Sequence, residues 1–269
     1  MSDAQSPTRF DTLLKSMVLE DASYQVRVGP DWMQGRTLYG GISSALCLRA
    51  VRLAYPDLPP LRSALIAFAG PSAGDVHIRP TLLRQGKSAA FISADLTSEA
   101  GFGVHATFCF GASRDSAKRQ VLLDMPSLPT PDDVYRPIPK DRPRPMFTHH
   151  FDMRVAKGAL PLSGGEDASI YWWLKALDSH EDFAEATLLA LADAPPPAAL
   201  SLFDSFTPLS TMTWMVDFLS DDPKSPDGWY AAHLKSEAIA DGYSAQNSYL
   251  WAADGRPLLA SRQTVALFG

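Results

Sequence analysis

Apolar positions recur with two different periods along this 269-residue chain, and the two periods alternate in a repeated order. In the first half, period-two alternation predicts strands at residues 24–28, 63–69, 75–83, 89–97 and 104–110. After the first of these, residues 42–53 carry apolar side chains at helical spacing, and Pro56, Pro59 and Pro60 end that helix. The first half is therefore predicted to fold as a strand, a helix and four further strands.

The second half repeats this order. Strands are expected at residues 151–155, 168–177, 212–219, 229–236, 244–251 and 258–267. A helix is expected at residues 182–193, and a run of three prolines (195–197) ends it. The halves also share a glycine-containing hairpin turn before the last strand, at residues 96–101 and 250–255. A repeat of this kind indicates two copies of one architecture. The alternative is a chance similarity between two unrelated α+β domains.

A stretch rich in proline and charge separates the halves. It extends from Arg114 to about Arg144 and holds Pro126, Pro129, Pro131, Pro137, Pro139 and Pro143. Such a composition is typical of a linker that lies over the surface. We therefore predict an α+β protein with domains at residues 1–113 and 147–269, joined by a linker at 114–146. In each domain, an antiparallel sheet is expected to wrap around one central helix.

Composition limits the partners. The formal net charge is −6, and no basic run is present, which argues against nucleic acid or an anionic membrane as a partner. No apolar run approaches the ~20 residues that span a bilayer, and the N-terminus lacks the pattern of a signal peptide. Cys47 and Cys109 lie in apolar segments, as buried reduced thiols do. We expect a cytoplasmic protein.

Five local features add to the repeated order. They are Tyr39-Gly40-Gly41 before the first helix, the proline-rich linker, Leu191-Ala192-Asp193 at the end of the second helix, Ser210-Thr211-Met212 at the start of a strand, and Ala260-Ser261-Arg262-Gln263 in the last strand. In this order and spacing they resemble the hot-dog superfamily, and within it the tandem hot-dog acyl-CoA thioesterases of the bacterial thioesterase II (TesB-like) type. The resemblance covers nearly the whole chain.

The resemblance implies a double hot-dog fold and hydrolysis of an acyl-CoA to a free acid and CoA. It implies that Asp193, Thr211 and Gln263 orient the water that attacks the thioester, with no metal or redox cofactor. Because hot-dog sheets commonly join edge to edge, it also implies a homo-oligomer. The chain departs from the family after Asp193, where Ala194 and three prolines replace a polar, Asn-containing turn.

Asp193 lies at the negative end of the second predicted helix, a position that disfavours a carboxylate by ~0.3–1 kcal/mol. The apolar stretch 188–192 precedes it, so partial burial is expected to raise the pKa of its carboxyl group. A raised pKa makes a carboxylate a better general base. The alternative is a solvated turn residue ahead of a proline run.

Gln263 shares its parity in the last strand with Leu259 and Val265, so it should point with them toward the helix. A buried amide must be hydrogen-bonded, so an inward-facing Gln263 favours a polar functional site. Aligning the two hairpin turns pairs Gln263 with Cys109, so this polar site is expected only in the second half. The alternative is an amide that satisfies nearby backbone groups.

Thr211 has the wrong parity for this site, because Met212 and Trp214 begin the apolar face of its strand. It reaches the site only if the strand bulges at its start. Otherwise it is simply a residue type that strands favour.

The Tyr39-Gly40-Gly41 turn is predicted to contact the substrate. N–H groups at a helix N-terminus are unpaired and can stabilise the oxyanion formed when a thioester carbonyl is attacked. Glycine allows the close approach that this requires. The alternative is a plain helix cap.

Two other functions stay open on the same scaffold. One is non-catalytic binding of acyl or aromatic ligands, and the other is hydration or dehydration of an enoyl-CoA. The second needs a histidine near an acid on the helix, and neither predicted helix interior contains one. No Gly-x-Ser-x-Gly motif and no Cys/His set with zinc spacing is present. Acyl thioester hydrolysis by an activated water is the prediction.

Overall fold

The first half of the chain supplies six strands of the main sheet and the longest helix. The computed structural model describes residues 7–134, 144–178 and 181–268. The strands are β1 (Val18–Glu20), β2 (Ser23–Val28), β5 (Leu61–Phe68), β6 (Gly74–Gln85), β7 (Ala89–Ser98) and β8 (Gly101–Gly111). The helix is α2 (Gly40–Ala54). Smaller elements precede it, namely α1 (Phe10–Lys15), the 3-10 helix η1 (Pro30–Trp32), and the hairpin of β3 (Met33–Gln34) and β4 (Thr37–Leu38). All of the strands and the helix predicted for this half are present.

The second half supplies the same set. Its strands are β9 (Phe151–Gly158), β10 (Ser169–Ala176), β11 (Leu209–Phe218), β12 (Tyr230–Ala240), β13 (Tyr243–Ala252) and β14 (Pro257–Leu267). The predicted helix is α3 (Ala184–Ala192), with the 3-10 helices η4 (Glu181–Phe183) before it and η5 (Ala198–Leu202) after it. Two further 3-10 helices, η2 (Pro131–Asp133) and η3 (Met146–His150), lie between the halves.

Apart from the two-stranded hairpin of β3 and β4, the described strands form one sheet, which corrects the prediction of two. All twelve are antiparallel in the order β1-β2-β6-β7-β8-β5-β11-β14-β13-β12-β10-β9, so the second half mirrors the first. The halves join where β5 pairs with β11, from Ala67 opposite Thr213 to Ser63 opposite Asp217. Left apart, both strands would be sheet edges with unpaired backbone groups, and pairing them satisfies those groups.

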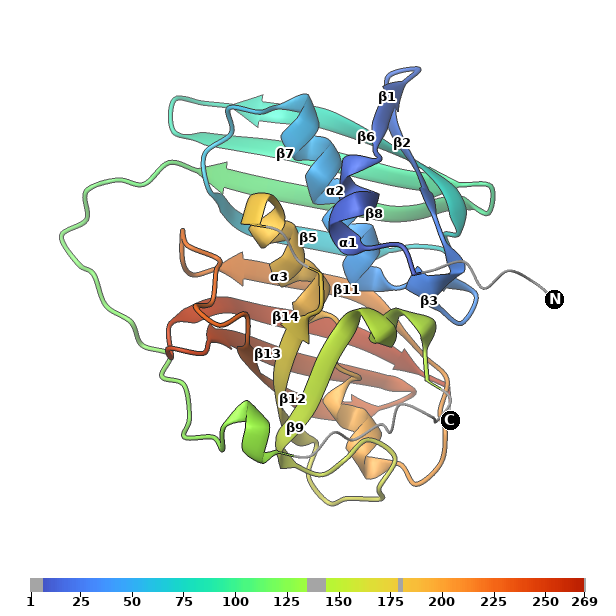
Figure 1. The fold of residues 1–269 in the computed structure, drawn as a ribbon, viewed down its shortest axis with the longest axis vertical. Coiled ribbons are helices and arrows are strands. Elements are labelled where there is room, and N and C mark those ends of the chain that lie inside the picture. Colours follow the sequence, from blue (N-terminus) through green and yellow to red (C-terminus); the bar gives the residue numbers. More distant parts are fainter. Residues whose placement is uncertain (1–6, 135–143, 179–180, 269) are drawn as a thin grey trace.

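The two long helices lie side by side in front of this sheet (Figure 1). They run antiparallel, because Arg52 near the end of α2 forms an ion pair with Glu185 near the start of α3. Helix α2 is buried along most of its length, since the sheet covers one side of it and other elements cover the rest. The main apolar core extends through both halves and includes Trp172 and Trp214.

The linker crosses the outer face of the second half. Its apolar side chains Leu123, Met125, Leu128 and Val134 pack against Trp173, Ala231 and Trp251. The predicted linker prolines Pro137, Pro139 and Pro143 lie outside the described residues, and the domain boundaries stay a prediction. Among the helices of the described residues, none is long and apolar enough to cross a membrane.

The register of the last hairpins corrects one alignment. Four residues lie between the paired Thr97 and Phe102, and five lie between the matching pair Trp251 and Pro257, so the second turn is one residue longer. Gln263 therefore corresponds to Phe108, and the predicted match to Cys109 is wrong. Phe108 is fully buried on the inner face, whereas Cys109 points to the outer face and is half-buried. The polar position is replaced by an apolar one in the first half, as expected.

Candidate active site

The N-terminus of α2 meets the C-terminus of α3. At this end of the helix pair, the hydroxyl of Tyr39 donates a hydrogen bond to the backbone carbonyl of Ala190. At the opposite end, the guanidinium of Arg52 holds both carboxylate oxygens of Glu185 at 2.7 Å. These two contacts fix the register of the helices. They bring the unpaired N–H groups at the start of α2 next to Asp193, which caps α3.

Asp193 and Gln263 are hydrogen-bonded to each other although they lie 70 residues apart. The side-chain nitrogen Nε2 of Gln263 donates to Oδ1 of Asp193 at 2.7 Å. The backbone N–H of Gly41 donates to the same carboxylate. The structure thus brings together three of the residues predicted for the site. Asp193 is only partly exposed, and Pro195 and Pro197 after it are buried, unlike a solvated turn.

Burial raises the pKa of the Asp193 carboxyl group to about 7, and the hydrogen bonds from Gln263 and Gly41 oppose that rise. The C-terminal end of α3 also disfavours a negative charge at this position, but the N-terminal end of α2 faces it with the opposite polarity. The carboxyl group therefore exchanges its proton near neutral pH, where a general base works best.

Both glycines of the turn are required by close contacts. A Cβ at Gly40 would lie 2.7 Å from a carboxylate oxygen of Asp193 and 3.1 Å from the ring of Phe68. A Cβ at Gly41 would lie 2.2 Å from the hydroxyl oxygen of Tyr39. Any larger residue would push the carboxylate or the tyrosine away, so the turn gives backbone N–H groups direct access to the acid.

Tyr39 belongs to the core of this junction. Its side chain has no exposed surface and stacks on Phe147 with the ring centroids 4.1 Å apart. Burial, with a smaller contribution from the charge of Asp193, raises the pKa of its hydroxyl well above the usual value. The hydroxyl is used in tying α2 to α3 through Ala190. A substrate-binding role for Tyr39 stays a prediction.

A second buried amide, which the sequence analysis missed, lies beside Gln263. Nε2 of Gln246 on β13 donates to Oε1 of Gln263 at 2.7 Å, and the backbone N–H of Ala198 donates to Oε1 of Gln246 at 2.8 Å. The signal was present, because Gln246 shares its parity in β13 with the buried Leu250. The same period-two argument that pointed to Gln263 would have found it.

Thr211 reaches the inner face of the sheet through a bulge. Thr211 pairs with Val265, but Thr213 pairs with Thr264, so Met212 is the extra residue in β11. Residues directly opposite each other in a sheet point to the same face, and Val265 shares its face with Gln263. Thr211 is therefore on the side of the sheet that holds the site, as the prediction required. Its role in orienting a water stays a prediction.

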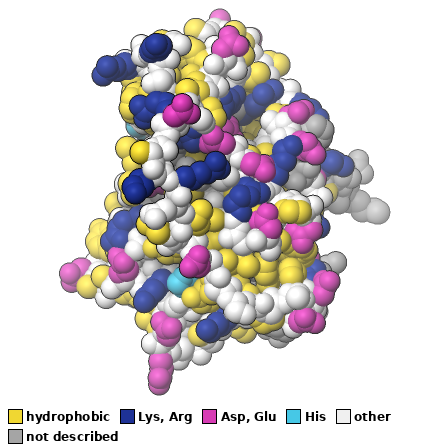
Figure 2. Space-filling model, turned by 90° about the vertical axis from the view of Figure 1, so that its left-hand side faces the viewer, with side chains coloured by type: hydrophobic (Ala, Val, Ile, Leu, Met, Phe, Trp, Pro, Cys, Tyr) yellow, Lys and Arg dark blue, Asp and Glu magenta, His cyan; other side chains and the backbone are white. Residues whose placement is uncertain are grey.

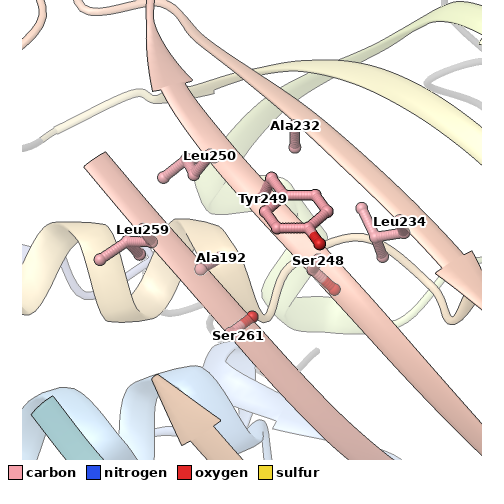
Figure 3. A pocket seen from close by; sticks show the side chains of 8 residues that line it. All are labelled: Ala192, Ala232, Leu234, Ser248, Tyr249, Leu250, Leu259 and Ser261. Atoms are coloured by element: carbon pink, nitrogen blue, oxygen red, sulfur yellow. The ribbon is translucent and has the colours of Figure 1, made fainter. Parts of the chain in front are cut away.

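A small cavity lies beneath the last turn of α3 (Figure 3). Its volume is about 10 Å³, which is close to the least that holds one water molecule. It is lined by Ala192, Ala232, Leu234, Ser248, Tyr249, Leu250, Leu259 and Ser261. Ser248 and Ser261 lie opposite each other on β13 and β14, one inward position away from Gln246 and Gln263. The cavity is thus next to the buried amides and is mainly apolar.

A larger groove, of about 340 Å³, lies at the other end of the helix pair. Arg52 and Lys224 contribute to it, and both are held in ion pairs, by Glu185 and Glu181. Because most of its lining residues come from the end of α2 and the start of α3, this groove is remote from Asp193. Its lining carries both positive and negative side chains. Figure 2 shows the same mixture on one side of the molecule, where Lys and Arg side chains alternate with Asp and Glu. In the part of the chain that the structure describes, no three His, Cys, Asp or Glu side chains form a group able to hold a metal ion.

Comparison with solved structures identifies the fold. A protein of unknown function with a hot-dog fold from Alicyclobacillus acidocaldarius superposes with a TM-score of 0.82 at 22% identity, covering 96% of this chain and 97% of that one. The TesB protein of Mycobacterium avium subsp. paratuberculosis gives 0.78 at 13% identity, with 96% and 97% covered. The acyl-CoA thioesterase II TesB2 of Mycobacterium marinum gives 0.73 at 14%, with 94% and 96% covered. These similarities show the hot-dog fold.

Family models give the assignment. Residues 28–111 match the acyl-CoA thioesterase N-terminal domain, and residues 124–267 match the acyl-CoA thioesterase C-terminal domain. No curated protein sequence matches the chain significantly. The predicted resemblance and the predicted enzyme class, an acyl-CoA thioester hydrolase, are confirmed by the two models. The chain belongs to the acyl-CoA thioesterase family.

Proposed function

We propose that this protein hydrolyses an acyl-CoA thioester to a free acid and CoA with Asp193 as the general base on a water molecule. The observation that supports this most is the carboxyl group of Asp193, with its pKa raised to about 7 by burial, at the junction of the two helices. For a carboxylate with only a structural role, such burial costs stability at neutral pH and brings no benefit. A general base gains the ability to take a proton at neutral pH.

The steps follow from the groups around the carboxylate. Asp193 takes a proton from the water, whose oxygen bonds to the thioester carbonyl carbon and gives a tetrahedral oxyanion. The carbon–sulfur bond then breaks, and the leaving thiolate takes the proton back from Asp193. An amide nitrogen carries two hydrogens, so Gln263 can hold both the carboxylate and the water. Thr211 supplies a hydroxyl on the same face of the sheet.

The N–H groups of Gly40 and Gly41 serve the oxyanion in this proposal. The N–H of Gly41 is bonded to the ionised Asp193 before reaction. When Asp193 accepts a proton, its negative charge is lost at the moment the thioester oxygen becomes negative. The same N–H then interacts more favourably with the oxyanion. A single donor of this kind contributes about 10²–10³-fold to kcat in other enzymes.

The small cavity holds at most one water molecule. Its volume of about 10 Å³ admits no acyl chain, so in this conformation it is not the acyl-binding site. We also propose, from the family resemblance, that the protein is a homo-oligomer and is located in the cytoplasm.

A thiol-release assay over acyl-CoA substrates of increasing chain length tests the function. We expect turnover to fall by about 10²–10⁴-fold in Asp193→Asn. The matched control is Asp75→Asn, which replaces an exposed carboxylate paired with Arg27 on the far strand β6. Unchanged turnover in Asp193→Asn would remove the proposed base. Binding of acyl-CoA with no thiol release would favour a ligand-binding protein, and a change in absorbance of an enoyl thioester without thiol release would favour a hydratase.

A further inference from the structure

We propose that Gln246 is a positioning residue, which fixes the orientation of the Gln263 amide so that an N–H group always faces Asp193. The inference rests on the proposed role of Asp193 as a base. Gln246 itself has no exposed surface. It acts only through Gln263, and nothing in the sequence resemblance assigns it a role.

The orientation of a glutamine amide is not determined by its shape. Its oxygen and its NH2 group are similar in size, so a half-turn exchanges an acceptor for a donor. With NH2 toward Asp193, Gln263 stabilises the carboxylate. With the oxygen toward Asp193, it repels the carboxylate and accepts a hydrogen bond from the protonated acid. A free amide would therefore turn each time Asp193 gained or lost its proton.

A backbone N–H group determines the orientation here, because it is a donor only and cannot turn. The N–H of Ala198 points at Gln246, so the oxygen of that amide must face it, at 2.8 Å. The NH2 of Gln246 is then directed at the oxygen of Gln263, at 2.7 Å. This leaves only the NH2 of Gln263 for the carboxylate, also at 2.7 Å. One fixed donor thus sets the direction of both amides.

The row of hydrogen bonds begins and ends in the same short segment. Asp193 and Ala198 are separated by Ala194 and the three prolines at 195–197, whose rings fix the backbone φ angle. The carboxylate and the anchoring N–H group are therefore held at a nearly constant separation. Because the amides are buried, each hydrogen bond between them is strong and an unmade one is costly. This gives the proline run after Asp193 a physical reason.

The first half shows that the fold itself does not need the two amides. Aligning the paired strands places Ile92 at the position of Gln246 and Phe108 at the position of Gln263. Both side chains are fully buried and apolar. The same sheet and helix thus pack well over an apolar pair. The amides occur only in the half where a carboxylate ends the helix.

Gln246→Met tests the proposal, since methionine has a similar volume and cannot donate to Gln263. The Asp193 carboxyl carbon is followed by NMR in protein labelled with ¹³C-aspartate, and its signal is the one missing from Asp193→Asn. With the amide free to turn, the protonated acid is favoured, so the titration midpoint should rise by about one pH unit or more. The apparent pKa of the acid limb in the pH profile of kcat/KM should rise by the same amount.

Asn247→Asp is the matched control. It adds a carboxylate one residue further along β13 on the outer face, where Arg262 already contacts Asn247. The Asp193 midpoint should not move in this variant. Gln246→Glu is a second test variant, to be used if Gln246→Met does not fold. An ionised glutamate accepts hydrogen bonds from both Ala198 and the Gln263 amide, which turns the Gln263 oxygen toward Asp193 and should raise the midpoint further.

The outcomes separate this inference from the proposed function. An unchanged Asp193 midpoint in Gln246→Met and Gln246→Glu would overturn the positioning role, even if Asp193→Asn abolishes thiol release. A shifted midpoint in a protein that releases no thiol from any acyl-CoA would support the fixed amide and refute the hydrolase. The NMR titration needs no turnover, so the two results are independent.

Discussion

Replacing Asp193 with asparagine is expected to stabilise the folded protein at pH 8 while it lowers the rate of hydrolysis by about 10²–10⁴-fold. Burial raises the pKa of the folded carboxyl group from 3.8 to about 7. Between these values the folded state holds a proton that the unfolded state has lost, so the stability of the wild-type protein falls as pH rises. Above pH 7 both states are ionised, and the loss is complete.

The magnitude follows from the size of the pKa difference. About three pH units at ~1.36 kcal/mol each give an upper limit of about 4 kcal/mol. Asparagine recovers less than this, because its NH2 group would face the donating N–H of Gly41 and Asp193 is partly exposed. We expect Asp193→Asn to gain about 1–3 kcal/mol over the wild-type protein at pH 8, with most of the gain gone at pH 4.

Urea unfolding followed by tryptophan fluorescence at pH 4, 5, 6, 7 and 8 measures this difference. Groups other than residue 193 titrate in both proteins and cancel in the comparison. Asp75→Asn, at an exposed ion pair, controls for the loss of any carboxylate. A difference that stays constant from pH 4 to pH 8 would show that Asp193 has an ordinary pKa. The general base would then lose its physical basis.

Three further changes have defined outcomes. The value of kcat/KM should fall tenfold per pH unit below about pH 7, because the Asp193 carboxylate is then protonated; a pH profile that is flat down to pH 5 contradicts this. Gly40→Ala should lower kcat at least tenfold by displacing the carboxylate, whereas Gly86→Ala, whose Cβ meets only a backbone oxygen at 3.6 Å, should not. Arg52→Met should cost about 1–3 kcal/mol in the free energy of urea unfolding, because it leaves Glu185 unpaired in a partly buried contact, with kcat changed less than twofold.

The site residues were predicted from the alternation of side chains between the two faces of a strand. That alternation holds only where a strand is regular. Gln263 faces inward with Leu259 and Val265, as alternation required. The match of Gln263 to Cys109 failed because the turn in the second half is one residue longer. An alignment that omits this residue matches each later position with a residue on the opposite face of the sheet. Thr211 needed a bulge, and whether a strand bulges depends on its neighbours. The same alternation in β13 places Gln246 on the inner face with Leu250.

By itself, the sequence determined the elements, their repeated order, and the carboxylate at the end of the second helix. These follow from apolar periodicity, proline positions and residue types, all of which act over a few neighbouring residues. Only the tertiary structure decided that β5 pairs with β11, that the start of α2 faces Asp193, and that Ala198 orients two amides. Each of these is a contact between segments that are apart in sequence or brought together by a turn. Such contacts depend on how whole elements pack, and no local pattern in the chain records that.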